Sequence, residues 1–305
     1  MSSPVLLLDG PQTRRPRSRH FLLCPPTYFD VRYAINPWMD PGVGVDVDLA
    51  VAQWSALVAS YREHGHRVEL LEPVPGLPDM VFAANGATVV DGYVLHARFA
   101  HRQRRAEARH HRRWARRARR GGLTGLVSLR AARAVNEGEG DFAVLADRIL
   151  AGHGFRTTTD AHRELAVLTG REVLSLELVD PSFYHLDVAL TVLDDERDHI
   201  AYYPAAFSEQ SQRLLAGLFP DAIIADDEDA RVLGLNCVSD GRHVWVPSGA
   251  EHLARTVTEA GYQVILTDLS ELLKGGGSVK CCTQEIRPRT TATPSSPTRE
   301  SRANA

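Results

Sequence analysis

Apolar residues along this chain of 305 residues recur in short blocks with either helix-like or strand-like spacing. Over residues 48–64 they fall near the spacing of one helix face, and Gly65 fits the stop at its C-terminus. Further helices are predicted over 160–168, 208–218 and 250–260. Strands are predicted over 19–24, 66–71, 88–90, 172–178, 200–203, 222–225, 232–236, 243–247 and 263–267, with others after the loop at 136–141 and within 181–193.

These elements form strand groups that are each interrupted by one helix, recurring about every 50 residues, and they predict an α/β fold. No sequence motif repeats at this period, so the period alone is weak evidence for a propeller. We expect a single domain over residues 19–287 and a flexible leader at 1–18. The tail at 288–305 is rich in Pro, Thr and Ser and is predicted to be disordered.

Composition narrows the class of protein. Hydrophobic residues make up 44% and charged residues 24% of the chain, which is typical of a soluble globular protein. The net charge of −3 argues against binding to nucleic acid or to a membrane surface, and no apolar run is long enough to span a bilayer. The four cysteines show no disulfide framework, so we expect a reduced, cytoplasmic setting. The sequence does not fix the oligomeric state, and a homodimer is one option.

The stretch from Arg102 to Arg133 departs from this composition, because it holds twelve arginines and its apolar positions are mostly alanine. A basic helix that binds nucleic acid is one interpretation, but the stretch lacks interleaved aromatic residues except Trp114. A solvated, poorly packed helix is the second. The third is a slip of the reading frame between about Ala108 and Ala134, because shifted GC-rich codons yield Arg, Ala and Gly.

A glycine-rich segment near the C-terminus carries the strongest chemical signal. Gly275 to Gly277 lead into a short apolar segment, predicted as a strand, that ends at Cys281 and Cys282. Glycine has no Cβ, so a ligand can approach this backbone closely. A cysteine attacks as its thiolate and needs a cation beside it, either a protonated His or the substrate itself. We therefore interpret Cys281 as a nucleophile toward a guanidinium carbon, and Cys282 as a core residue.

Three other stretches would complete such a site. They are Asp79 with Asn85, the loop Glu137-Gly138-Glu139-Gly140-Asp141, and His185-Leu186-Asp187. Carboxylates can clamp the edges of a planar guanidinium and leave its carbon open to a thiolate. The histidine can protonate the departing amine and then activate water. Asp187 would share a strand face with His185, and would hold further substrate donors or orient the imidazole.

Each stretch also has a structural explanation, since an acidic glycine loop is commonly a solvated turn and a lone His on a strand is commonly structural. All four occurring in one chain makes a joint accident much less probable. A zinc site is disfavoured because adjacent cysteines lack chelating spacing. We therefore expect neither a metal nor a cofactor.

These motifs resemble the amidinotransferase, or pentein, superfamily, and within it the dimethylarginine dimethylaminohydrolases. The resemblance runs from about Arg19 to Arg287 apart from the arginine-rich stretch, and it is most specific at Leu77-Pro78-Asp79-x-Val81-Phe82, at the acidic loop, at His185-Leu186-Asp187 and at 275–283. It implies a five-bladed α/β propeller of ββαβ units with the site in a central channel. It further implies a cofactor-free hydrolase that converts dimethylarginine to citrulline and dimethylamine.

The same resemblance assigns roles to residues. It implies Cys281 as the nucleophile and His185 as the general acid and base. The guanidinium ligand in the acidic loop is Glu137 or Glu139, and we favour Glu137 because it opens the Glu-Gly-x-Gly-Asp pattern. Two arginines, Arg98 and Arg156, would bind the substrate's α-carboxylate. The implied substrate contacts are completed by four further residues: Asp79, Asn85, Asp141 and Asp187.

One departure bears on the substrate. Where the dimethylargininases usually carry an acidic pair, this chain has Ala84-Asn85, and an asparagine there looks more like the arginine dihydrolases of the same superfamily. Dimethylarginine is the first choice of substrate, and arginine, giving ornithine or citrulline, is the second. The rivals from other classes are a non-catalytic guanidino-binding protein on the same scaffold and an amidino-group transferase.

Overall fold

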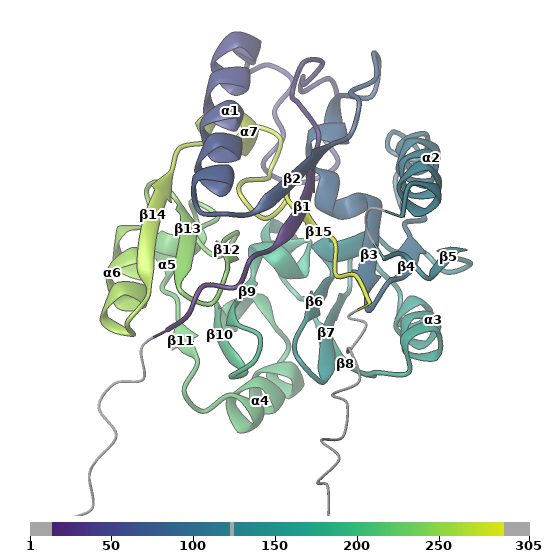
Figure 1. Ribbon diagram of the computed structural model, residues 1–305. Helices are drawn as coiled ribbons and strands as arrows, with labels where there is room; N and C mark the ends of the chain where they lie inside the picture. The colour runs from purple at the N-terminus through teal and green to yellow at the C-terminus, as the bar shows by residue number, and fades with distance from the viewer. Residues whose placement is uncertain (1–13, 123–124, 290–305) are drawn as a thin grey trace, which may run out of the picture.

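The computed structural model describes residues 14–122 and 125–289 (Figure 1). Within these residues the strands are β1 (His20–Leu23), β2 (Arg67–Leu70), β3 (Ala87–Val90), β4 (Tyr93–His96), β5 (Ser128–Ala131), β6 (Phe142–Val144), β7 (Arg148–His153), β8 (Glu172–Glu177), β9 (Leu190–Asp194), β10 (His199–Tyr202), β11 (Ile223–Ile224), β12 (Val238–Ser239), β13 (His243–Pro247), β14 (Gln263–Thr267) and β15 (Gln284–Glu285). They form five sheets of three strands, in the orders β15-β1-β2, β3-β4-β5, β6-β7-β8, β11-β10-β9 and β12-β13-β14.

All five sheets have the same connectivity. The middle strand is antiparallel to one edge strand and parallel to the other, and a helix crosses between the two parallel strands. The crossover helices are α1 (Val47–Glu63), α2 (Glu107–Arg120), α3 (Thr159–Thr169), α4 (Glu209–Leu218) and α6 (Glu251–Glu259). The expected α/β fold of ββαβ units is therefore confirmed, while the closure of the five sheets into a propeller stays a prediction.

The first sheet joins the two ends of the described chain. Its antiparallel edge strand is β15, which follows all other units in sequence and pairs with β1, so that Phe21 lies opposite Glu285. Pairing of this kind closes a long loop, and it fixes the segment just before β15 against the body of the molecule. That segment contains Cys281.

The sequence of helix α1 explains both where the helix begins and which of its faces is buried. Asp46 accepts a hydrogen bond from the backbone N–H of Leu49 at 2.9 Å and so caps the first turn. Trp54, Leu57 and Tyr61 recur at helical spacing and are buried against the sheets. Burial of each such side chain contributes about 1.5–3 kcal/mol. The same hydrophobic core extends to Cys281 and Cys282.

Two predicted strands and one predicted strand face are wrong. Residues 232–236 form a turn after the short helix α5 (Asp227–Ala230), and Leu233 has a φ of 55°, which an extended strand cannot accommodate. The segment after Gly277 continues in turns that follow α7 (Ser270–Leu273). His185 and Asp187 do not share a strand face, because residues 186–188 form a 3-10 turn.

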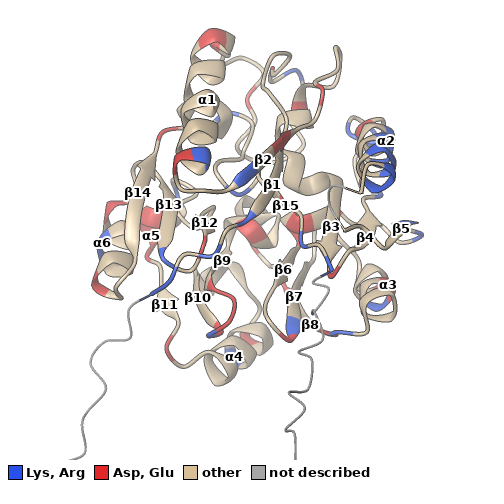
Figure 2. Ribbon diagram, in the orientation of Figure 1, with Lys and Arg blue, Asp and Glu red and all other residues tan. Residues whose placement is uncertain are grey.

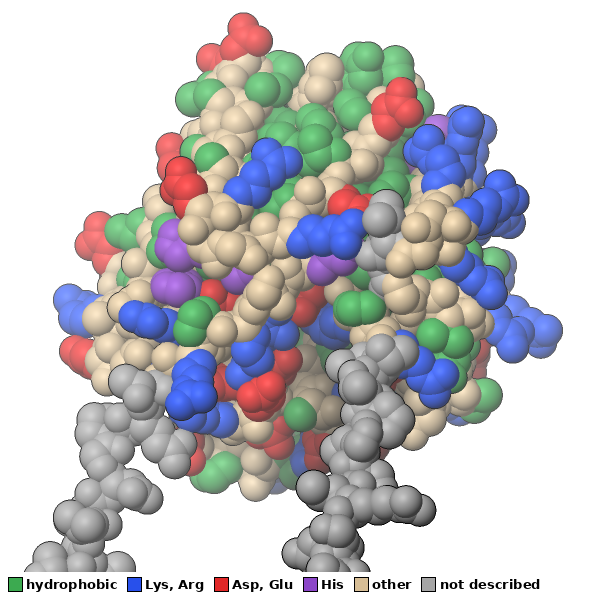
Figure 3. All heavy atoms as spheres, in the orientation of Figure 1, with side chains coloured by type: hydrophobic (Ala, Val, Ile, Leu, Met, Phe, Trp, Pro, Cys, Tyr) green, Lys and Arg blue, Asp and Glu red, His purple; other side chains and the backbone are tan. Residues whose placement is uncertain are grey.

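The arginine-rich stretch supplies the crossover helix and the third strand of its sheet. Trp114, Ala115 and Ala118 are buried on α2 and belong to the same apolar cluster as Val89 and Val94 of that sheet. A cavity of about 190 Å³ lies between α2 and β5, lined in part by alanines. The opposite face of the helix is basic (Figures 2 and 3), with exposed side chains at Arg109, Arg113, Arg116, Arg117, Arg119 and Arg120.

These features fit the solvated, loosely packed helix best of the three interpretations. A slip of the reading frame concerns the gene and stays a hypothesis, which resequencing of the coding DNA would decide: an unbroken native frame would rule it out. The loose packing follows from composition, because alanine side chains cannot fill the space between a helix and a sheet.

Part of the predicted leader is placed against the body of the molecule. The Arg14 guanidinium lies 3.6 Å from the centre of the Tyr262 ring, and Arg17 donates to Asp194 at 2.9 Å. The prediction of a flexible leader is therefore wrong for residues 14–18, and its remainder, like the tail from 290, lies outside the described residues. None of the described helices combines the length and the apolar character that crossing a membrane requires.

Candidate active site

The candidate residues come from equivalent places in the five units. Apart from Arg98 and Arg156, which follow the second strands β4 and β7, each lies in the turn just before the first strand of its unit. Contacts join the turn before β3 to the turn before β6, and the latter to the turn before β9. The contributing residues are Asp79 and Asn85 before β3, 137–141 before β6, His185 and Asp187 before β9, Asn236 before β12 and Cys281 before β15.

The sulfur of Cys281 is buried between two polar side chains. The thiol donates to Asp187 Oδ2 at 3.3 Å, and Asn236 Nδ2 donates to the sulfur at 3.2 Å. Cys281 also accepts, through its backbone carbonyl, a hydrogen bond from the N–H of Ala84 at 3.1 Å. A Cβ on Gly277 would lie 3.0 Å from Cys281 Cβ and 2.5 Å from the Phe82 ring, so this close approach requires glycine.

Burial disfavours the ionised form of both the Cys281 thiol and its hydrogen-bond acceptor, the Asp187 carboxyl. It raises the pKa of Cys281 well above the usual range, and the neighbouring Asp187 carboxylate raises it further. Burial also raises the pKa of Asp187, to about 7, although Lys280 and the Cys281 thiol oppose the shift. These shifts favour the thiol form of Cys281 in the unliganded protein, and a positive charge placed nearby would favour the thiolate.

His185 is oriented by the acidic loop. Its Nε2 lies 2.9 Å from Glu137 Oε2 and 3.9 Å from Asp141 Oδ2. Nδ1 of the same ring is buried and has no hydrogen-bond partner among the described residues. A Cβ on Gly140 would lie 3.2 Å from this Nδ1, so the glycine leaves that side of the imidazole open. One nitrogen is thus anchored while the other is available for proton transfer.

Glu137 is held as a carboxylate despite being fully buried. Burial disfavours its charge, but Arg156 at 2.8 Å and His185 outweigh that effect and keep its pKa well below the usual range. The Arg156 guanidinium also lies 4.6 Å from the centre of the Tyr184 ring and donates to the carbonyl of Ile35 at 2.6 Å. Burial raises the pKa of the nearby Asp141 to about 6.

A second network surrounds Asp79 and Asn85. The buried Arg104 donates to Asn85 Oδ1 at 2.7 Å and to Glu107 at 2.9 Å, and its Nε lies 3.8 Å from Asp79 Oδ2. Tyr33 donates to the same Asp79 oxygen at 2.8 Å. Asp79 Oδ1 is buried without a partner among the described residues, and burial raises the pKa of this carboxyl. The group therefore holds one carboxylate oxygen ready for a donor.

The structure does not bring two predicted residues to this cluster. Arg98 is exposed and donates to the backbone carbonyl of Arg133, so it does not form a pair with Arg156. Glu139 points to the other side of its loop, where Lys280 lies at 2.6 Å and Arg287 at 2.7 Å. Glu137, not Glu139, is the loop carboxylate beside His185.

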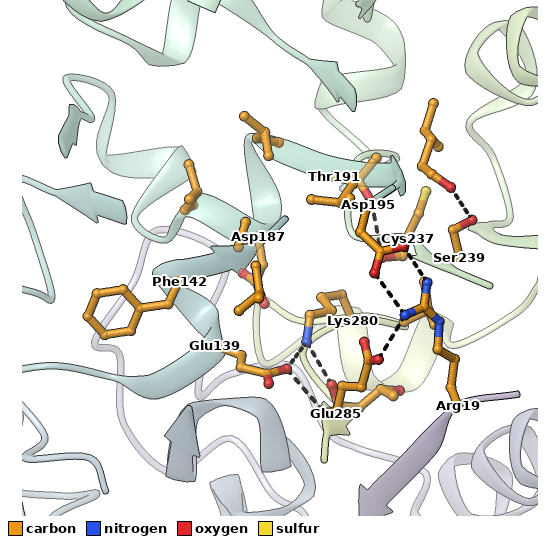
Figure 4. Close-up of a pocket in the computed structure, with 18 of the residues that line it drawn as sticks. Arg19, Glu139, Phe142, Asp187, Thr191, Asp195, Cys237, Ser239, Lys280 and Glu285 are labelled. Carbon is orange, nitrogen blue, oxygen red and sulfur yellow. Dashed lines mark hydrogen bonds and ion pairs between the residues drawn. The ribbon is translucent and has the colours of Figure 1, made fainter. Parts of the chain in front are cut away.

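Glu139 lines a cavity, shown in Figure 4, whose wall combines charged and apolar side chains. Asp187 forms part of its wall, but Cys281, His185 and Glu137 do not line it. The charged groups in the cavity are largely paired with one another, as Arg19 is with Asp195 at 2.7 Å. This cavity is therefore not where the proposed chemistry would take place.

Sequence reasoning missed two buried residues of the site. Arg104 lies in the arginine-rich stretch, and nothing in the sequence distinguishes it from the exposed arginines beside it. Asn236 lay at the end of a wrongly predicted strand. Its position before β12, equivalent to that of Cys281 before β15, is the signal that could have found it.

One group of side chains has the spacing of a metal site, away from the cluster. Asp226, Asp229 and His252 offer oxygen and nitrogen atoms that lie within 4.8 Å of one another. Asp226 caps α5, and His252 Nδ1 lies 3.1 Å from it, so these contacts are already explained by a helix cap and a hydrogen bond. The described residues of the candidate active site show no comparable grouping.

Comparisons with known proteins find relatives along most of this chain. A family model described as eukaryotic N,N dimethylarginine dimethylhydrolase matches residues 42–195. An N(G),N(G)-dimethylarginine dimethylaminohydrolase from Mycobacterium tuberculosis is 50% identical over 92% of this chain and 90% of its own length. A bifunctional arginine dihydrolase/ornithine cyclodeaminase from a Nostoc species is 37% identical over 87% of this chain, which spans only 37% of that longer protein.

Solved structures with a similar fold include enzymes of both kinds. The substrate-bound N-terminal domain of a cyanobacterial arginine dihydrolase superimposes with a TM-score of 0.83 at 32% identity, covering 90% of this chain and all of that domain. A dimethylarginine dimethylaminohydrolase carrying a covalent pyridine adduct superimposes with a TM-score of 0.71 at 20% identity, covering 88% of this chain. The second likeness shows the fold alone.

Proposed function

Because this chain belongs to the dimethylarginine dimethylaminohydrolase family, we infer that it hydrolyses the guanidino group of dimethylarginine to give citrulline and dimethylamine. The observation that carries this inference is the 50% identity to a curated enzyme of that activity along nearly its whole length. The site geometry supports it, because a buried thiol, an oriented imidazole and several carboxylates surround one region.

Substrate binding supplies the missing positive charge. Two buried carboxylate oxygens, Asp79 Oδ1 and Asp187 Oδ1, have no hydrogen-bond partner among the described residues, and a guanidinium carries the donors that would satisfy such oxygens. Placed beside Asp187, the cation offsets the negative charge that raises the pKa of the Cys281 thiol. Ionisation of the nucleophile is therefore coupled to binding, and Asp187 Oδ2, at 3.3 Å, is positioned to accept its proton.

Cys281 then adds to the guanidinium carbon. A carbon–sulfur bond forms, and the bond from that carbon to the dimethylamino nitrogen breaks as His185 protonates the leaving amine. Dimethylamine departs and a thiouronium remains on the sulfur. His185 next takes a proton from water, which adds to the same carbon, and the sulfur leaves with the bonding electrons to give citrulline and the free cysteine. Glu137 acts throughout as the carboxylate that orients His185.

A second candidate reaction is the hydrolysis of arginine to ornithine or citrulline with release of ammonia. Two observations favour it. An asparagine at position 85 makes the chain resemble the arginine dihydrolases of the superfamily, and the chain is 37% identical to a bifunctional enzyme with that activity. Asn85 Oδ1 is already occupied by Arg104, so its amide helps to hold that arginine and leaves less negative charge for the substrate.

Product identity tests the proposal. The protein is incubated with dimethylarginine and with arginine, and citrulline, ornithine, dimethylamine and ammonia are quantified. We expect equal amounts of citrulline and dimethylamine from dimethylarginine, at a kcat/KM above that for arginine. Turnover of arginine alone would establish the second reaction. Binding without products would indicate a non-catalytic protein, and products that require an added amine would indicate a transferase.

A further inference from the structure

Asn236 contacts the reacting sulfur but belongs to no recognised motif of the chain. It is fully buried and lies in the turn before β12, the one unit that contributes none of the predicted site residues. The connectivity of the five sheets makes this turn equivalent to those that carry Asn85, Glu137, His185 and Cys281. Position in the fold, and not sequence similarity, therefore directs attention to it.

Every polar atom of the Asn236 side chain is used at the nucleophile. Its Oδ1 accepts from the backbone N–H of Cys281 at 3.0 Å and from that of Ser278 at 3.1 Å. Its Nδ2 donates to the carbonyl of Asp187 at 2.9 Å and to the sulfur of Cys281 at 3.2 Å. One amide thus fixes the cysteine turn, the Asp187 turn and the sulfur itself.

The direction of the last hydrogen bond matters most. A side-chain amide N–H can only donate, so it stabilises a sulfur that carries negative charge more than a neutral thiol. Asp187 exerts the opposite effect on the same sulfur, because its carboxylate disfavours the thiolate.

We propose that Asn236 is a further catalytic residue, which stabilises the Cys281 thiolate through Nδ2 and positions the nucleophile through Oδ1. The inference rests on the proposed role of Cys281 and adds the group that balances Asp187. The thiolate forms when the substrate arrives and forms again when citrulline is released, so the donor acts in both halves of the reaction.

The central test replaces Asn236 by aspartate. In Asn236→Asp the oxygen that accepts from Cys281 and Ser278 is retained, while the donor to the sulfur and to the carbonyl of Asp187 is lost and a negative charge is introduced. We expect kcat to fall at least about 100-fold, which corresponds to about 2.7 kcal/mol, with a much smaller change in KM. We also expect the alkaline rise of kcat/KM to move to higher pH.

A second readout does not depend on dimethylarginine. The rate at which iodoacetamide alkylates Cys281, located by tandem mass spectrometry, follows the thiolate fraction. It should fall at least tenfold in Asn236→Asp at each pH. An unchanged alkylation rate and pH profile would overturn the proposal even if turnover fell. Conversely, a slower alkylation combined with full turnover in Cys281→Ser would leave the donor role in place and refute the proposed nucleophile.

Asn36 provides the matched control. It anchors the same glycine segment, with Nδ2 donating to the carbonyl of Gly275 at 3.1 Å and Oδ1 accepting from Trp38, but it does not touch the sulfur. Asn36→Asp should leave the alkylation of Cys281 within about twofold of the wild-type rate, since it removes a loop contact and not the thiolate donor. An equal loss in both variants would mean that loosening of the loop is the cause, which contradicts the proposal.

Folding of the variants is checked by circular dichroism and thermal unfolding. If Asn236→Asp does not fold, Asn236→Ser takes its place, because serine is small and cannot reach all four partners. If neither folds, the side-chain amide signals of Asn236 in the wild-type protein are followed by nuclear magnetic resonance. Alkylation of Cys281 should shift these signals, and unchanged signals would overturn the contact.

Discussion

At the scale of single residues, the main feature of the site is that several of its ionisable side chains are buried, which shifts their pKa values. Burial raises the pKa of Asp187 to about 7 and that of Asp141 to about 6, and it keeps Cys281 as a thiol. Glu137 stays charged only because Arg156 and His185 lie against it. Under the proposed mechanism a cationic substrate offsets these shifts, so that its binding and the ionisation of Cys281 would occur together.

The two glutamates of the acidic loop can be separated by mutation. Glu137→Gln removes the partner that orients His185, so we expect kcat to fall at least about 100-fold. It also leaves the buried Arg156 facing a neutral amide, so the free energy of unfolding should fall as well. Glu139→Gln leaves Lys280 and Arg287 facing a neutral amide, so the free energy of unfolding should fall by about 3 kcal/mol with kcat nearly preserved. Steady-state kinetics and urea unfolding measure both quantities. The reverse pattern would return Glu139 to the catalytic role.

The carboxyl of Asp187 makes stability depend on pH. An ordinary Asp has a pKa of about 3.9 in the unfolded chain, and the folded value is raised to about 7. The native state therefore binds the extra proton between these values, and its free energy of unfolding falls as pH rises through that window. Asp187→Asn removes this loss, so the variant should gain at least about 1 kcal/mol over the wild type on going from pH 4.5 to pH 7.5.

The measurement is urea unfolding of both proteins at the two pH values. A difference in unfolding free energy that does not grow with pH would show that Asp187 is already ionised in the unliganded protein. The variant is expected to lose turnover, because the amide cannot accept the thiol proton.

At the scale of elements, helix α2 combines two features that lower its stability, repulsion between like charges and sparse apolar packing. Its exposed arginines stand three and four residues apart, so like charges face one another along the helix. The apolar part of its buried face consists of Trp114 and three alanines, beside a cavity of about 190 Å³. The helix therefore gains little from packing and loses some stability to repulsion.

Arg113→Glu should stabilise this helix. The new carboxylate lies four residues from both Arg109 and Arg117, so two repulsive pairs become attractive, and we expect a gain of about 0.5–1 kcal/mol. Thermal unfolding at low and at high salt measures it, and the gain should shrink in salt. Arg213→Glu on α4 is the control, because Arg213 is paired with Glu209 at 3.4 Å and its replacement should destabilise. A gain in both variants would contradict the argument.

Elements with periodic patterns were predictable and the site turns were only partly so. Helix α1 and strands β13 and β14 follow directly from apolar spacing. The turn at 232–236 is predicted as a strand because most of its residues are apolar. The left-handed backbone conformation of Leu233 cannot be inferred from composition. His185 and Asp187 were chosen for the right chemistry, but the 3-10 turn between them sends one to Glu137 and the other to Cys281. Such separations depend on long-range contacts that local patterns do not encode.

At the scale of the whole molecule, one connectivity repeated five times assembles the site. Residues from positions 79 to 281 meet because each unit presents the same turn, and the pairing of β15 with β1 secures the last one. Charge is distributed unevenly over this frame. The stretch 102–133 carries twelve arginines and one acidic residue, so the rest of the chain has a net charge of −14 although the total is only −3. Salt should therefore affect stability mainly through the α2 face.

The central claim is that the sulfur of Cys281 carries the reaction, and its neighbour supplies an internal control. Cys282 is equally buried and adjacent in sequence, but its sulfur has no hydrogen bond to Asp187 or Asn236 among the described residues. The measurement is release of citrulline and dimethylamine from dimethylarginine by Cys281→Ser and by Cys282→Ser. The account predicts no detectable turnover in the first variant and near wild-type turnover in the second. Turnover that survives in Cys281→Ser and disappears in Cys282→Ser would contradict it.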